Sequence, residues 1–108
     1  MGRKLADLER DSEGYLKNQG DWDLEIAGEL AAEDSLVLTE EHWELIRFER
    51  EFYRQFNTTP AIRMLTRAVR EKFGEDKGSS IYLHKMFPGG PAKQLAKIAG
   101  LPKPVKCI

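Results

Sequence analysis

The stretch TEEHWELIRFEREFYRQFNTTP, residues 39–60, contains the longest helical pattern in the sequence. Thr39 is a favoured helix cap, and the two acids that follow it complement the positive end of the helix dipole. Apolar residues then recur at helical spacing as far as Phe56, so we expect one helix from about Thr39 to Phe56. The residues that this spacing assigns to its buried face are Trp43, Ile46, Tyr53 and Phe56, with Phe48 and Phe52 widening the face.

Start and stop signals divide the rest of the C-terminal half into three further helices. Asn57-Thr58-Thr59-Pro60 stops one helix and starts another, with Thr59 as the predicted cap and Pro60 at the first helical position. Ser79 or Ser80 is expected to open the helix after that one. The predicted helices cover residues 60–73, 81–87 and 91–99, and Gly74 and Gly100 follow the first and the last of them.

Upstream of residue 39 the pattern is less regular. Residues 1–20 are polar with turn residues at 11–14, which favours a small β-hairpin or an irregular lead-in. Asp21 is the predicted cap of a helix through about Ala32. The whole sequence therefore predicts a mostly α (α+β) fold, an orthogonal bundle of about five helices with a possible N-terminal hairpin. We expect a single domain over residues 1–108, made of the lead-in at 1–20, the helical bundle at 21–100 and a flexible C-terminal arm at 101–108.

Length and hydropathy indicate one small domain outside the membrane. A chain of 108 residues suffices for one hydrophobic core, and no apolar run approaches the roughly 20 residues of a membrane span. Charged residues interrupt the N-terminus before a signal-like apolar stretch forms, so secretion is not expected. We therefore expect a cytoplasmic protein.

The charges are distributed unevenly along the chain. Residues 1–76 carry 11 Lys and Arg against 18 Asp and Glu, whereas residues 77–108 carry six Lys and no acid. A basic C-terminal third favours an acidic partner, either protein or nucleic acid. A solubilised helical surface explains the same distribution equally well, so both interpretations stay open.

Cys107 is the only cysteine, and it stands next to last in the chain. A single cysteine excludes an internal disulfide, a CxxC redox pair and a cysteine-rich zinc site. A terminal position favours exposure, and Pro102 and Pro104 keep the preceding arm extended. An exposed thiol on a stiff arm suits a sulfur carrier, with a fortuitous terminal cysteine as the alternative. Lys106 and the terminal carboxylate have opposing effects on the thiol, so strong activation is not expected in the free protein.

No metal and no cofactor are expected. A metal site needs three or four ligands, and the two histidines, His42 and His84, lie in different predicted helices. We expect both at the surface or at an interface.

A nucleic-acid-binding protein is the alternative function that the residues leave open. The predicted helices at 60–73, 80–87 and 91–99 can be drawn as a helix-turn-helix. The would-be recognition helix, however, offers only Lys93, Gln94 and Lys97 as polar readers and no arginine for guanine edges.

Several segments together resemble the DsrC/TusE family of sulfur-relay proteins. They are FPGGPAKQLAKIAGLPKPVKCI at residues 87–108, Gly14-Tyr15-Leu16, Glu41-His42-Trp43 and FNTTPAIRM at residues 56–64. The resemblance covers nearly the whole chain, and its most specific part is the ending Gly-Leu-Pro-Lys-Pro…Cys. It implies a small, mostly helical orthogonal bundle with an N-terminal hairpin and a flexible arm.

The resemblance also implies a function. One branch of the family has a second arm cysteine at the position that Ala96 occupies here, so this chain is similar to the single-cysteine branch. In that branch the penultimate cysteine, here Cys107, accepts a persulfide sulfur from a TusBCD-like donor complex. It passes the sulfur to an MnmA-like tRNA thiouridylase, which makes 2-thiouridine at the wobble position of tRNA. These relations imply a sulfurtransferase; a one-cysteine DsrC-like paralogue with another acceptor, or a regulatory role, stays open.

Overall fold

Five helices and two short 3₁₀ turns form the regular structure of residues 4–104, the part of the chain that the computed structural model describes. The helices are α1 (Leu24–Glu33), α2 (Glu40–Phe56), α3 (Ile62–Phe73), α4 (Ser80–Met86) and α5 (Pro91–Ile98), and the turns are η1 (Leu5–Asp7) and η2 (Gln19–Asp21). The prediction of a mostly α bundle of about five helices is confirmed.

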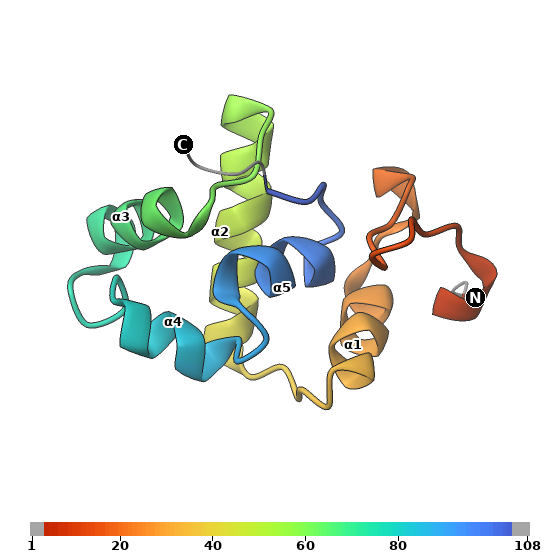
Figure 1. Cartoon of the computed structure of the whole chain (residues 1–108), viewed down its shortest axis with the longest axis horizontal. Coiled ribbons are helices and arrows are strands. Elements are labelled where there is room, and N and C mark those ends of the chain that lie inside the picture. Colours follow the sequence, from red (N-terminus) through yellow and green to blue (C-terminus); the bar gives the residue numbers. More distant parts are fainter. Residues whose placement is uncertain (1–3, 105–108) are drawn as a thin grey trace.

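Helix α5 lies at the centre of the bundle and contacts each of the other four helices (Figure 1). Pro91 occupies its first position, where the fixed φ of proline is already helical. Five of the eight residues of α5 are buried. The bundle therefore closes around a short helix whose C-terminal end leads directly into the arm.

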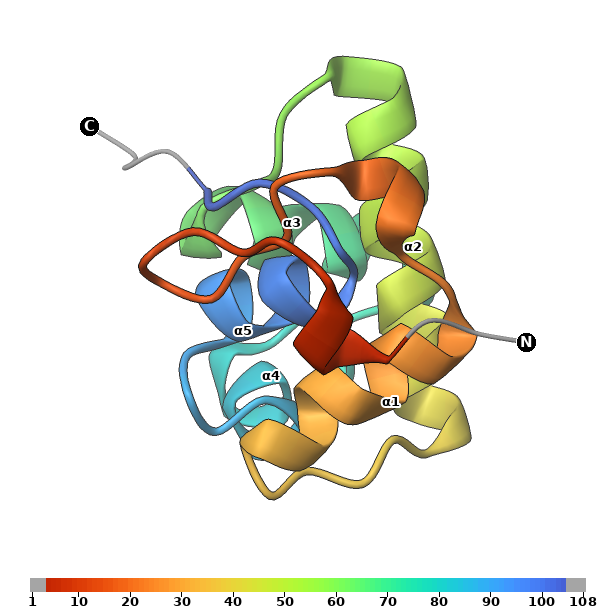
Figure 2. The same cartoon turned by 90° about the vertical axis from the view of Figure 1, so that its right-hand side faces the viewer.

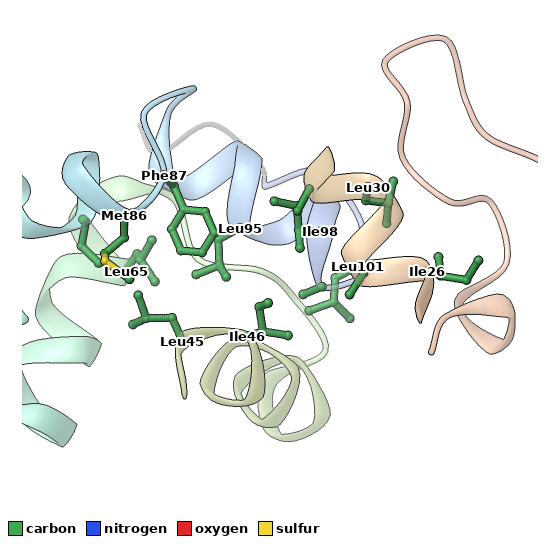
Figure 3. Packing of buried hydrophobic residues seen from close by; sticks show 14 of the residues in the cluster. Ile26, Leu30, Leu45, Ile46, Leu65, Met86, Phe87, Leu95, Ile98 and Leu101 are labelled. Atoms are coloured by element: carbon green, nitrogen blue, oxygen red, sulfur yellow. The ribbon is translucent and has the colours of Figure 1, made fainter. Parts of the chain in front are cut away.

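The hydrophobic core fills the space between α5 and the buried faces of its neighbours (Figure 3). Burial of one such leucine, isoleucine or phenylalanine side chain contributes roughly 1.5–3 kcal/mol to folding. The fully buried side chains of this core include Ile26, Leu30, Leu45, Ile46, Leu65, Phe87, Leu95 and Ile98.

Most predicted helix ends are confirmed, and two predicted starts are wrong. Ser79 caps α4 by accepting a hydrogen bond from the Tyr82 amide at 3.1 Å. Helix α1 is capped by Asp23 rather than Asp21, because the Asp23 carboxylate accepts from the Ile26 amide at 2.8 Å. Helix α3 begins at Ile62, not at Pro60: its N-cap residue is Ala61, whose backbone is extended, and the Thr59 hydroxyl donates to the distant Pro102 carbonyl.

The buried face of α2 differs in part from the predicted one. Ile46 is buried as expected, but Phe56 is 60% exposed. Helix α2 has 17 residues and α5 only eight, so the C-terminal turns of α2 extend beyond the core (Figure 1). The buried residues of α2 are His42, Leu45, Ile46 and Glu49.

The N-terminal segment lies over α1 and α5 (Figure 2). The possible hairpin reduces, within the described residues, to one isolated antiparallel bridge between Arg10 and Leu16. Arg10 forms an ion pair with Glu33 of α1 at 2.6 Å, and the Tyr15 hydroxyl donates to the Lys93 carbonyl of α5 at 3.1 Å. This segment is therefore held by contacts with α1 and α5 and not by pairing between two strands.

None of the helices in residues 4–104 has the length and apolar character needed to cross a lipid bilayer.

Candidate functional site at the root of the C-terminal arm

Cys107, the predicted site residue, lies outside the described residues, which end at Pro104. The geometry that bears on it is therefore that of the preceding segment, residues 99–104, which we call the arm root. This segment links the end of α5 to the part of the chain that carries the cysteine.

The arm root begins with a sharp turn at Gly100. Its φ is +73°, a left-handed conformation that glycine adopts without strain. The Gly100 amide donates to the Lys97 carbonyl at 3.1 Å and the Leu101 amide to the Ala96 carbonyl at 3.0 Å. These two bonds are the Schellman arrangement that ends many helices, so the predicted role of Gly100 is confirmed.

Trp22, from the loop between η2 and α1, covers this turn. Its indole nitrogen donates to the Ile98 carbonyl at 2.8 Å. A Cβ atom at position 100 would lie 2.3 Å from Trp22 Cδ1, so the approach of the two residues requires a glycine there. The turn and the indole therefore form one packed unit.

Arg50 of α2 holds the next carbonyl. Its Nη1 donates to the Ala99 carbonyl at 2.6 Å, and its guanidinium carbon lies 3.9 Å from the centroid of the Trp22 ring. Partial burial lowers the pKa of Arg50, but a guanidinium remains charged at any physiological pH. Leu101 follows and is only 2% exposed, so the arm root starts inside the core.

Thr59, between α2 and α3, holds the arm root beyond the helix. Its hydroxyl donates to the Pro102 carbonyl at 2.9 Å, and the residue is 4% exposed. The ammonium group of Lys103 lies 2.8 Å from the Glu13 carboxylate. Because both partners of this ion pair are exposed, it contributes little to stability.

Side chains from three separate segments thus bind the carbonyls of residues 98, 99 and 102. Sequence reasoning did not predict Trp22, Arg50 or Thr59 as partners of the arm. Each stands between 43 and 76 positions away from its carbonyl, and no local pattern links them. These bonds fix the position of residues 98–102 relative to the bundle.

Ala96 is fully buried on α5. A side chain at this position, which the family resemblance aligns with a second arm cysteine, faces the core of the described structure. No thiol stands there in this chain, so the two-cysteine chemistry of the other branch has no counterpart among residues 4–104.

The two histidines have different surroundings. His84 is exposed, as predicted, but the prediction of a surface position for His42 is wrong, because it is 6% exposed. Its Nδ1 accepts from the Thr39 amide at 3.0 Å, which leaves the proton on Nε2 to be donated to the Met86 carbonyl at 2.8 Å. Histidine here takes the place of the Glu or Gln of a capping box, a substitution that sequence reasoning did not recognise.

No group of three or more His, Cys, Asp and Glu side chains that would hold a metal ion occurs within residues 4–104.

The helix-turn-helix alternative is not compatible with the position of α5. A recognition helix must lay an exposed face in a DNA groove, whereas α5 is the central helix of the bundle. Gln94 is 6% exposed and bonds to the Gly89 amide and to Asp34, each at 3.0 Å. Lys97 lies 3.3 Å from Asp34, so two of the three predicted polar readers are engaged within the protein.

Comparison with known proteins places these features in a family. The model of the family described as DsrC like protein matches residues 4–108 of this chain. A protein of Photorhabdus laumondii subsp. laumondii named sulfurtransferase TusE is 62% identical over 102 residues, which are 94% of this chain and 92% of that protein. A sulfurtransferase TusE of Salmonella choleraesuis is 60% identical and covers 94% of each chain.

Solved structures agree with the sequence matches. The NMR structure of Allochromatium vinosum DsrC superposes with a TM-score of 0.85 at 50% identity, over 94% of this chain and 90% of that one. The crystal structure of the oxidized gamma-subunit of dissimilatory sulfite reductase (DsrC) from Archaeoglobus fulgidus gives a TM-score of 0.78 at 37% identity, over 94% and 92%.

Proposed function

Because the chain belongs to the DsrC-like protein family and is a sulfurtransferase of a sulfur relay, we propose that it carries a persulfide sulfur on Cys107. One observation carries this proposal. A persulfide forms on a thiol, and the whole sequence contains a single cysteine. If this protein holds the transferred sulfur covalently, Cys107 is the residue that holds it.

The transfer conserves atoms and electrons. The Cys107 thiolate attacks the outer sulfur of a donor persulfide, so a new S–S bond forms on Cys107 and the S–S bond of the donor breaks. The electron pair of the broken bond leaves with the donor, which becomes a thiolate and takes up a proton. No external oxidant or reductant is needed, and the same exchange in the opposite sense delivers the sulfur to an acceptor thiol.

The proposal extends to the partners on either side. We assign the donor to a TusBCD-like complex and the acceptor to an MnmA-like tRNA thiouridylase with its tRNA, working in the cytoplasm, where thiols stay reduced. Support for these partners comes from the relatives named sulfurtransferase TusE and from the single arm cysteine. A DsrC-like paralogue that serves another acceptor is the alternative that the experiment below distinguishes.

A deletion strain that lacks wobble 2-thiouridine tests the proposal. The wild-type chain is expected to restore the modification, and Cys107→Ser is expected to restore none of it. Thermal denaturation of Cys107→Ser is expected to match wild type within a few degrees, because a residue next to last in the sequence is expected to add little to the core.

Two outcomes would overturn parts of the proposal. Thiolated tRNA in the Cys107→Ser strain would show that the sulfur does not travel on this residue. A wild-type chain that forms a persulfide on Cys107 but leaves tRNA unmodified would replace the tRNA thiouridylase by another acceptor.

A further inference from the structure

We propose that Thr59 is a positioning residue for sulfur transfer, because its hydrogen bond to the Pro102 carbonyl restrains the first residues of the arm. The proposal rests on the function proposed for Cys107 and adds a requirement to it. The thiol must be presented from a defined point as well as be exposed.

The arm root has more hydrogen bonds than the end of α5 requires. The amides of Ala99, Gly100 and Leu101 already bond to carbonyls of the last turn. Trp22 and Arg50 then satisfy the carbonyls of residues 98 and 99, which completes the helix end.

The Pro102 carbonyl lies beyond the helix, in an exposed residue, so its hydrogen bond is not one that the end of α5 requires. The buried Thr59 hydroxyl nevertheless bonds to it at 2.9 Å. This bond therefore restrains the arm itself, and the end of α5 is complete without it.

The restraint at Pro102 affects the residues that follow it. Proline fixes its own φ near −65° and disfavours helical backbone at the residue before it, so Pro102 and Pro104 narrow the directions available to the chain as far as Pro104. An arm that starts in a restricted set of orientations loses less conformational entropy when it enters a partner's cleft. Transfer between proteins then benefits from the Thr59 bond, whereas reaction with a small molecule does not.

Thr59→Val and Thr59→Ser form a matched pair that tests the role of the Thr59 hydrogen bond. Valine keeps the shape and removes the donor, while serine keeps the hydroxyl. We expect Thr59→Val to slow loading of Cys107 from a persulfide-charged cysteine desulfurase relay about fivefold, the factor that corresponds to one net hydrogen bond. Thr59→Ser is expected to stay close to wild type.

Two small-molecule reactions distinguish a positioning role from a general loss of structure. Loading from glutathione persulfide and alkylation by iodoacetamide are expected to proceed at wild-type rates in both variants. Arg67→Met, which removes an exposed guanidinium from α3, is the control expected to leave all three rates unchanged.

The direction of the arm is measured separately with a nitroxide label on Cys107. We expect the pattern of paramagnetic broadening over the backbone amides of the body to spread in Thr59→Val and to return in Thr59→Ser. An unchanged pattern, or a relay rate for Thr59→Val equal to wild type, would overturn the positioning role. Failure of the sulfur-carrier function is recognised differently, because the wild-type chain would then take up no sulfur from the relay or from glutathione persulfide.

Discussion

Glu49 is a carboxyl group buried without a hydrogen-bond partner in the part of the chain that the structure describes. It is fully buried on α2, and neither of its oxygens has a hydrogen-bond partner among the described residues. Burial raises its pKa to about 8, because the charged form is desolvated there. At pH 7 the folded protein therefore holds Glu49 mainly as the neutral acid.

This protonation makes stability fall as the pH rises. The folded-state pKa lies above the unfolded value, so the folded state binds the extra proton between about pH 4.5 and 8. The contribution of Glu49 to the free energy of unfolding is largest below pH 4.5. On the order of 3 kcal/mol of it is lost between pH 4.5 and 7. Glu49→Gln, which cannot ionise, is expected to be more stable than wild type at pH 7.5 and to gain less at pH 5.

Urea denaturation of wild type and Glu49→Gln at pH 5, 6, 7 and 8 measures the difference directly. Because the comparison is between two chains at each pH, the other titrating groups cancel. If the difference in unfolding free energy is the same at pH 5 and pH 8, Glu49 is ionised in the folded protein and our description of its site is wrong.

The buried polar residues show where sequence reasoning fails. The spacing of apolar residues in α2 correctly places Ile46 inside, but Glu49 and His42 share the same face. His42 is buried because Thr39 and Met86 satisfy both ring nitrogens. The Met86 carbonyl is 44 positions away, so no local pattern predicts that satisfaction.

Helix ends divide into those set locally and those set by distant segments. Ser79, Gly74, Pro91 and Gly100 act through neighbouring backbone groups, and their predicted roles are confirmed. Thr59 looks like a cap by the same rules, but Ala61 is the N-cap residue of α3, and the Thr59 hydroxyl donates to the Pro102 carbonyl of the arm root. Phe56 is exposed because α5 is short, and the length of α5 cannot be predicted from the residues of α2.

Two glycines in or next to helices are expected to respond oppositely to alanine. Gly28 lies within α1, and a Cβ atom added there would have nothing within 4 Å, so Gly28→Ala is expected to stabilise by roughly 0.5–1 kcal/mol. Gly100 has a positive φ and touches Trp22, so Gly100→Ala is expected to destabilise by at least about 1 kcal/mol.

Thermal denaturation of the two variants tests how α1 and α5 are built. Gly28→Ala is expected to raise the midpoint by a few degrees and Gly100→Ala to lower it by more. A Gly100→Ala protein as stable as wild type would mean that the left-handed turn and its contact with Trp22 are not required.

The molecule as a whole compensates its uneven charge internally. Of the five C-terminal lysines that the structure describes, three pair with acids of the N-terminal half: Lys77 with Glu44, Lys97 with Asp34 and Lys103 with Glu13. The sequence left a choice between an acidic partner and a solubilised surface. For these three lysines the structure shows a different arrangement, because their acidic partners lie in the same chain.

The arm root and the end of α5 also contact segments that are far away in the sequence. The loop before α1, helix α2 and the loop before α3 all bond to residues 98–102. A sequence analysed segment by segment predicts an arm and a thiol but not the point from which the arm leaves. That point depends on tertiary contacts between α5, the arm root and distant segments of the chain.

Mass spectrometry of the intact protein tests sulfur carriage on Cys107 most directly. After incubation with a persulfide-charged cysteine desulfurase relay, the wild-type chain is expected to gain the mass of one sulfur atom, on the C-terminal peptide and removable by a reductant. Cys107→Ser is expected to gain nothing. A wild-type chain that gains no mass, or an equal gain in Cys107→Ser, would contradict the account.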